Sequence, residues 1–136
     1  MQEFSVRTGA GSGMVDITGH VRDAIRAEGI RDGICLVFCP HTTAAITIQE
    51  NADPDVVTDI VGELNQIVPL DDGYAHGEGN SAAHIKSSLV GCSELIVVEG
   101  GRPVLGTWQG VYFCEFDGPR SRRVVVKSVG SDPRGT

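Results

Sequence analysis

Apolar patterns of the strand and helix type occur in runs along this chain and do not alternate one by one. Strand-like patterns cover residues 3–7, 14–17, 34–39, 43–48, 94–99, 107–116 and 122–129, and helix-like patterns cover 18–28, 54–67 and 81–89. Runs of strands separated by runs of helices are typical of α+β domains, whereas a doubly wound domain alternates them. We therefore expect one α+β domain over residues 1–136, with a mixed, mainly antiparallel β-sheet packed against about three helices.

Local signals place the ends of two of these helices. Asp53 can accept hydrogen bonds from free backbone N–H groups, and Pro54 suits the first helical position because it has no N–H to leave unpaired. Asp55 favours the positive end of the helix dipole. Thr18 is expected to cap the first helix in the same way as Asp53 caps the second.

Turn residues indicate how some of the strands are connected. The glycine-rich segment 9–13 predicts a hairpin between 3–7 and 14–17, and Gly100-Gly101 predicts a second turn. The continuous apolar run 34–39 is typical of a strand covered on both faces. For Trp108, the single tryptophan, core packing is the expected role.

Composition excludes some partners. Acidic residues outnumber basic ones 18 to 11, for a net charge of −7, so a nucleic-acid partner is not expected. No apolar run approaches the roughly 20 residues that cross a bilayer, and residues 1–14 lack the apolar core of a signal peptide. The cysteines at 35, 39, 92 and 114 contain no C-x-x-C pair, which favours free buried thiols in a reducing compartment. We therefore expect a cytoplasmic protein without a membrane partner.

Histidines stand beside breaks in the expected elements. His41 follows Pro40 at a strand end. His76 lies in the polar loop 69–79, and His84 lies in the first turns of the following helix. Three neutral imidazoles can hold a divalent metal and leave a fourth position open. His41, His76 and His84 are therefore candidate ligands for a divalent metal, with zinc favoured by the nitrogen donors; the alternative is three hydrogen-bonded structural or surface histidines.

The segment 77–81 runs directly into a helix start and contains two glycines. Free backbone N–H groups at such a position can bind an anion, and Asn80, Lys86 and Ser87 lie in or near the first turns. These features predict binding of a phosphate or carboxylate, and a diphosphate substrate would also suit magnesium. The alternative is an ordinary glycine loop followed by a helix cap.

Polar residues at other strand ends add further candidates. Glu50 and Asn51 lie between a strand and a helix start, and Gln109 opens the long strand 107–116. Glu115 interrupts the apolar end of that strand, where it can pair with Arg122, orient a histidine or accept a proton. An ion pair between Glu115 and Arg122 is the expected arrangement.

Four stretches taken together resemble one known family. They are Pro40-His41-Thr42-Thr43-Ala44-Ala45; Gln49-Glu50-Asn51-Ala52-Asp53-Pro54; His76-Gly77-Glu78-Gly79-Asn80 with Ala83-His84-Ile85-Lys86-Ser87-Ser88; and Gly106-Thr107-Trp108-Gln109-Gly110 with Glu115 and Gly118-Pro119-Arg120-Ser121-Arg122-Arg123. In this order they resemble the YjbQ-like family, whose members are often named secondary thiamine-phosphate synthases. The resemblance spans nearly the whole chain.

The resemblance implies a mixed β-sheet with packed helices and a homotrimer, in which sites can form between subunits. It also implies an enzyme that joins a pyrimidine diphosphate to a thiazole phosphate and releases pyrophosphate. Two other functions stay open: a metal-dependent hydrolase, and a non-catalytic trimer that binds a metal or a metabolite. The candidate catalytic residues are His41, His76, His84, Glu50 and Glu115, and the candidate substrate-binding residues are Thr42, Asn51, Asn80, Lys86, Ser87, Gln109, Arg120 and Arg122.

Overall fold

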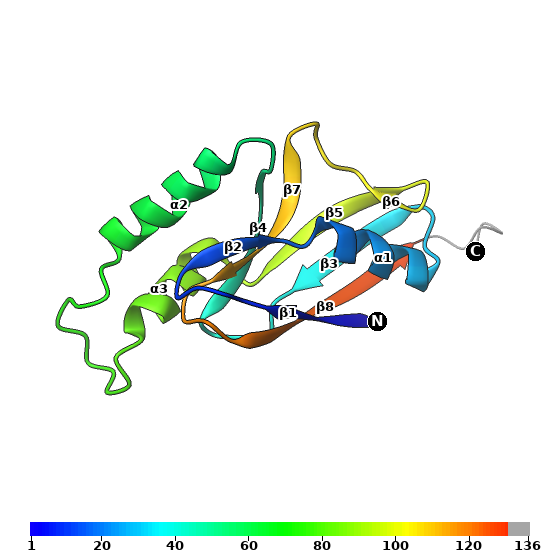
Figure 1. The fold of residues 1–136 in the computed structure, drawn as a ribbon. Helices are drawn as coiled ribbons and strands as arrows, with labels where there is room; N and C mark the ends of the chain where they lie inside the picture. Colours follow the sequence, from blue (N-terminus) through cyan, green and yellow to red (C-terminus); the bar gives the residue numbers. More distant parts are fainter. Residues whose placement is uncertain (131–136) are drawn as a thin grey trace.

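A computed structural model describes residues 1–130 of the chain, so the last six residues of the expected domain lie outside the described range (Figure 1). The strands are β1 (Gln2–Arg7), β2 (Gly13–Asp16), β3 (Gly33–Phe38), β4 (Ala44–Glu50), β5 (Ser93–Glu99), β6 (Arg102–Pro103), β7 (Gln109–Glu115) and β8 (Ser121–Gly130). The helices are α1 (Thr18–Glu28), α2 (Pro54–Ile67) and α3 (Ser81–Val90). The α+β class expected from the sequence is confirmed.

The strands form two sheets, and every described pairing is antiparallel. The five-stranded sheet has the order β1-β8-β3-β5-β6, and the three-stranded sheet has the order β2-β7-β4. The expected hairpin between β1 and β2 is wrong, because β1 pairs with β8 whereas β2 pairs with β7. The Gly100-Gly101 turn does connect the paired strands β5 and β6.

One hydrophobic core joins both sheets to α1. Val21 and Ile25 of α1 are fully buried together with Val37 of the larger sheet and Phe113 of the smaller one. Strand β3 buries alternate side chains, and Ile34 on its other face is 48% exposed. The prediction that residues 34–39 are covered on both faces is therefore wrong, because this antiparallel sheet has one face open.

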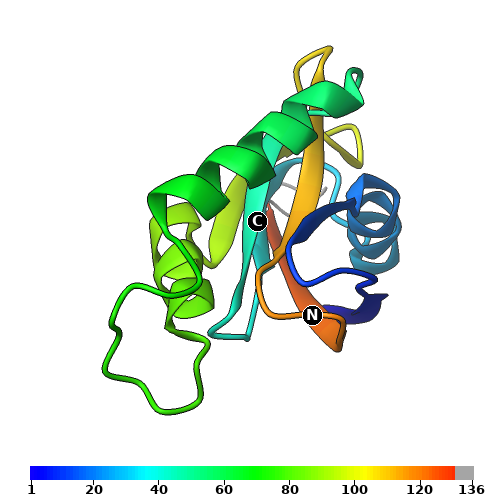
Figure 2. The ribbon, with the colours of Figure 1, turned by 60° about the vertical axis from the view of Figure 1, so that its left-hand side comes forward.

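The other two helices lie across the strands from α1, as Figure 2 shows. Helix α3 packs on β4, where Ala83 joins a small cluster with Ala45 and Phe116. Helix α2 has no fully buried side chain. No helix among the described residues is both long enough and apolar enough to cross a membrane.

The helix starts agree only in part with the local signals. Asp53 Oδ1 accepts a hydrogen bond from the Asp55 N–H at 2.9 Å, as expected for a cap. Thr18 does not cap α1, and its prediction is wrong. Instead, Asp16 Oδ1 accepts from both the N–H and the hydroxyl of Thr18, and the same hydroxyl accepts from the N–H of Val111 at 2.9 Å. The hydroxyl therefore ties α1 to β7.

Candidate functional site

Three predicted histidines meet at one cavity of about 510 Å³, which we call the histidine cavity. Its walls come from the β3–β4 connection, the loop before α3, the first turns of α3 and the β7–β8 turn. It is lined by Pro40, His41, Thr42, Thr43, His76, Glu78, Asn80, His84, Asp117, Arg120 and Arg122. The fold therefore brings together segments that are separated by up to about 80 positions in the sequence.

A buried ion pair forms part of this wall. Glu115 is 1% exposed and accepts hydrogen bonds from Nε of Arg122 at 2.9 Å and from its second guanidinium nitrogen. The same nitrogen of Arg122 donates to Thr43 Oγ1 at 2.8 Å, and the Thr8 hydroxyl donates to Glu115 at 2.7 Å. The expected ion pair is thus present, and it fixes Arg122 at the cavity wall.

Two opposing effects act on the Glu115 carboxyl. Burial by itself raises its pKa, because it disfavours the charged form. Hydrogen bonds from Arg122 and Thr8 and from the backbone N–H of Asp117 outweigh burial and lower the pKa. Glu115 is therefore held as a carboxylate that orients Arg122, and its buried position makes a role as a proton acceptor for a ligand unfavourable.

The ring of His41 is held in one tautomer by the backbone. Its Nε2 accepts a hydrogen bond from the Arg123 N–H at 3.0 Å, so the neutral ring carries its proton on Nδ1. Burial, assisted by the positive charges of Arg122 and Arg123, lowers the pKa of His41. His41 therefore acts as a neutral group with an Nδ1–H donor.

His76 and His84 form a close pair at the other side of the cavity. Their rings lie 5.5 Å apart in an edge-to-face arrangement. Nε2 of His76 is 3.9 Å from a carboxylate oxygen of Glu78, and its side chain is 42% exposed. Because the two imidazoles are so close together, either of them can exchange a proton with the same bound group.

Asp117 links the remaining polar residues of the wall. Its Oδ2 accepts from Asn80 Nδ2 at 2.9 Å and from Arg120 at 3.0 Å. Burial acts to raise the pKa of Asp117, but these hydrogen bonds and the positive charge of Arg120 lower it. Arg120 is 53% exposed, so part of its guanidinium stays accessible to a ligand.

Other predicted site residues lie elsewhere in the described chain. Glu50 and Gln109 pair across β4 and β7, and the backbone N–H of Asn51 donates to the Trp108 carbonyl. These residues lie at the end of β4 that is opposite to Thr43. At the usual rise of a strand, the two ends of β4 are about 20 Å apart. The described chain does not bring them to the histidine cavity, and their part in the site stays a prediction.

Lys86 and Ser87 also lie outside the histidine cavity. The Ser87 hydroxyl donates to the Ala44 carbonyl at 2.7 Å and is buried, so it ties α3 to β4. Lys86 points into a neighbouring cavity.

Trp108 is 62% exposed, so its expected core position is wrong. Cys35, Cys39 and Cys114 are buried free thiols as expected, whereas Cys92 is exposed.

The histidine donors do not fit a three-histidine metal centre within the described chain. Residues 1–130 contain no group of three His, Cys, Asp or Glu side chains that could hold a metal ion. A metal-binding imidazole needs one bare nitrogen for the metal and usually donates its other N–H to an acceptor. His41 has the opposite pattern, because its Nε2 accepts from Arg123. The metal stays a prediction from the sequence.

Three residues that complete the hydrogen bonds of this site are not among the candidate site residues expected from the sequence. Asp117 orients Asn80 and Arg120, and Thr43 and Thr8 complete the hydrogen bonds around the buried ion pair. The position of Asp117 two residues after Glu115 was an available signal. The two threonines had none, because their partners lie 79 and 107 positions away in the sequence.

Comparison with known proteins places this chain among close relatives. The family model described as UPF0047 protein YjbQ-like matches residues 2–131. UPF0047 protein MJ1081 of Methanocaldococcus jannaschii is 50% identical over 94% of this chain and 93% of its own length. UPF0047 protein YugU of Bacillus subtilis is 48% identical over 96% of this chain and 99% of its own length.

Solved structures give the same result. A crystal structure of a YjbQ/UPF0047 family protein from Clostridium acetobutylicum has a TM-score of 0.93 and 53% identity, covering 95% of this chain and all of the other. The YbjQ-like protein of unknown function from Sulfolobus solfataricus has a TM-score of 0.91 and 31% identity, covering 96% of both chains. These names state no activity, so function has to be inferred from the cavity.

Proposed function

Since the chain belongs to the UPF0047 protein YjbQ-like family, we propose that it is a cytoplasmic enzyme that acts on a phosphorylated small molecule in the histidine cavity. One observation carries this proposal: His41, His76, His84 and Arg120 come from different segments and line one cavity. Arginine and histidine are the side chains expected around a bound phosphate that exchanges protons with the protein. The free thiols agree with a reducing compartment.

Each group in the cavity has a distinct task. Arg120, fixed by Asp117, binds phosphate oxygens through the accessible part of its guanidinium. His41 donates its Nδ1–H to the same phosphate group. His76 and His84, being adjacent, supply a proton to an oxygen of the leaving phosphate group and regain it from water.

The specific reaction proposed is that of a thiamine-phosphate synthase, possessed as a secondary activity. The thiazole ring nitrogen forms a bond to the carbon of the pyrimidine that carries the diphosphate, so a pyrimidine diphosphate and a thiazole phosphate give thiamine phosphate and pyrophosphate. Pyrophosphate leaves with the electron pair of the broken carbon–oxygen bond, so the cavity has to stabilise negative charge. Arg120 and the Nδ1–H of His41 supply that stabilisation, and no step in the proposal depends on a metal.

We also propose that the protein is a homotrimer. The open face of the larger sheet carries a row of exposed apolar side chains, in which Ile34 pairs with both Val97 and Val129. Leu95 on the same strand as Val97 is 64% exposed. A contiguous apolar sheet face is typical of a surface that is covered in an assembly. In a trimer, Glu50 and Gln109 of one subunit would be free to approach the histidine cavity of another.

Two measurements test the enzyme proposal. Isothermal titration with inorganic phosphate and pyrophosphate should show binding that falls about 10-fold or more in Arg120→Gln and in His84→Ala. Matched controls are Arg26→Gln, an exposed arginine of α1, and His20→Ala, whose ring stacks on Phe4 away from the cavity. A turnover assay with the two thiamine precursors should then show product in the wild type and the controls.

The outcomes separate the rival functions. Phosphate binding without turnover of the two precursors would replace the synthase with a metabolite-binding protein or with another reaction at this cavity. Equal binding in His84→Ala, Arg120→Gln and the two controls would overturn the assignment of the histidine cavity. Circular dichroism of each variant shows that a loss of binding is not a loss of folding.

A further inference from the structure

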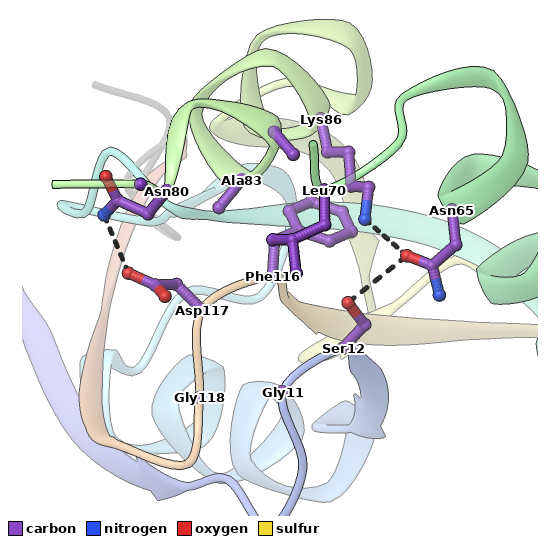
Figure 3. A pocket seen from close by; sticks show the side chains of 12 residues that line it. Gly11, Ser12, Asn65, Leu70, Asn80, Ala83, Lys86, Phe116, Asp117 and Gly118 are labelled. Carbon is purple, nitrogen blue, oxygen red and sulfur yellow. Dashed lines mark hydrogen bonds between the residues drawn. The ribbon is translucent and has the colours of Figure 1, made fainter. Parts of the chain in front are cut away.

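A second cavity of about 490 Å³ lies beside the histidine cavity and contains a buried lysine (Figure 3). Lys86 of α3 is only 5% exposed, and its ammonium points toward Asn65 of α2. The cavity, which we call the lysine cavity, is as large as its neighbour and within the range of small-molecule sites. Its other walls include Ser12, Leu70 and Phe116.

The described residues use only part of the hydrogen-bonding capacity of the Lys86 ammonium. Nζ donates to Asn65 Oδ1, which also accepts from the Ser12 hydroxyl at 3.5 Å (Figure 3). The Phe116 ring centroid lies 5.9 Å from Nζ. No carboxylate among residues 1–130 forms an ion pair with Lys86. An ammonium has three hydrogens to donate, so its hydrogen-bonding capacity is not exhausted.

Burying a cation without a counter-charge is unfavourable. Burial lowers the pKa of Lys86, and no neighbouring charge of the described chain offsets this effect. Buried charged groups in proteins are normally paired or bound to a ligand. A negatively charged ligand group in the lysine cavity would supply the missing charge and accept the remaining hydrogens. An apolar or neutral ligand group would not offset the free-energy cost of burying the Lys86 ammonium.

The two cavities share a wall. Asn80 and Asp117, joined by a hydrogen bond of 2.9 Å, line both of them. Asn80 Oδ1 is buried and accepts no hydrogen bond from the described residues. This oxygen provides an acceptor for a hydroxyl or N–H group at the boundary of the two cavities. A single molecule that crosses this boundary would meet basic groups at both of its ends.

We propose that the lysine cavity is a second ligand subsite that takes an anionic group, so the two cavities together bind a phosphate and a second anionic group, carried by two phosphorylated substrates or by the two ends of one molecule. This proposal rests on the assignment of the histidine cavity as the phosphate site. The second group is a phosphate or a carboxylate, since a buried ammonium with free donors recognises both. Leu70 and Phe116 contact the part of the molecule between its two ends.

Two series of linear probes test the proposal. One series consists of alkane α,ω-bisphosphates of three to six carbons, and the other carries a carboxylate in place of the second phosphate. Each probe is compared by isothermal titration with the alkyl monophosphate of the same length. At the best length, the second anionic group should tighten binding about 10- to 100-fold, as expected for hydrogen bonds to a charged group. The series whose affinity increases more shows whether the lysine cavity prefers a phosphate or a carboxylate.

Lys86→Met should remove that gain and bring each double-ended probe to the affinity of the alkyl monophosphate of the same length. The matched control is Lys127→Met, because Lys127 is the only other lysine of the chain and lies exposed on β8. Lys86→Arg, which keeps the charge, should retain part of the gain and shows that Lys86→Met acts through charge. Thermal unfolding of each variant reports whether the fold is kept.

A second measurement needs no variant. With two lysines in the chain, the side-chain NMR signals of Lys86 and Lys127 can be followed separately. The best bisphosphate should raise the pKa of Lys86 more than the alkyl monophosphate of the same length does, and the Lys127 signal serves as the internal reference.

The results distinguish the two proposals. Equal affinity of double-ended and single-ended probes at every length, together with an unmoved Lys86 pKa, would overturn the second subsite. Monophosphate binding that still depends on Arg120 and His84 would in that case leave the histidine cavity intact as the phosphate site. Monophosphate binding that does not depend on them would overturn the histidine cavity first.

Discussion

The guanidinium of Arg122 and the carboxylate of Glu115 form a two-point ion pair in which the side chains are 6% and 1% exposed. Removing one charge from such a pair leaves the other buried without compensation. Glu115→Gln keeps the shape but removes the charge, and we expect it to lower the free energy of unfolding by about 3–5 kcal/mol. Urea unfolding measures this change.

The matched control for that variant is Glu3→Gln. Glu3 pairs with Arg123 at 3.2 Å on the surface, where both side chains are about half exposed. Such pairs contribute about 0–1 kcal/mol. Similar losses in the two variants would show that the buried pair does not stabilise the wall of the histidine cavity.

The ring of His41, which is partly buried and accepts a hydrogen bond from the Arg123 N–H, predicts a pH dependence of stability. Burial and two arginines lower the pKa of His41 in the folded protein, so the unfolded chain binds the proton first as the pH falls. The free energy of unfolding should therefore decrease below about pH 6.5, the usual value for histidine, by up to about 1.4 kcal/mol per pH unit. His41→Gln should reduce this slope, and an unchanged slope would contradict the assignment.

The same hydrogen bond predicts that His41 does not bind zinc in the described arrangement. Elemental mass spectrometry on protein purified without a histidine tag should find well under one metal per chain. Zinc titration should leave the NMR signal of the Arg123 N–H in place. One zinc per chain that is lost in His84→Ala, together with a shifted Arg123 signal, would instead establish a three-histidine metal site and direct assays toward metal-assisted chemistry.

The exposed apolar face of the larger sheet predicts a defined assembly. Light scattering after size-exclusion chromatography should give the mass of a trimer for the wild type. Val97→Lys places a charge in the middle of this face and should shift the protein toward monomer. Asp23→Asn at an exposed position of α1, which changes the net charge by the same amount, serves as the control. A wild type that is monomeric at tens of micromolar would contradict the trimer.

The β7–β8 turn depends on close backbone packing at Gly118. A Cβ at this position would lie 2.3 Å from the Ala10 carbonyl oxygen and 2.8 Å from Cγ of Glu115. Gly118→Ala should therefore destabilise the fold by about 1–3 kcal/mol. Gly77→Ala is the control, because nothing lies within 4 Å of a Cβ there and its φ is not positive. Equal stability of the two variants, measured by urea unfolding, would contradict this account.

Position relative to local structure is informative about which residues of the sequence meet at the histidine cavity. His41, His76 and His84 each stand beside a strand end, a loop or a helix start, and all three line the histidine cavity. Glu50 and Gln109 also stand at strand ends but lie at the opposite end of β4. The position of a residue at the end of a strand or helix does not show which of these ends lie side by side in the fold, because this depends on strand pairing.

Local chemistry in the sequence determined where the elements of this protein lie. Asp53 and Pro54 start α2 because their own backbone and side-chain properties favour a helix start, and glycines end α1 and α3. Only the tertiary structure decided that β1 and β2 join different sheets, that Trp108 is exposed and that Lys86 has no carboxylate partner among residues 1–130. These properties arise from contacts between residues about 20 to more than 100 positions apart, and such pairing is selected by burial of the whole core and not by local preference.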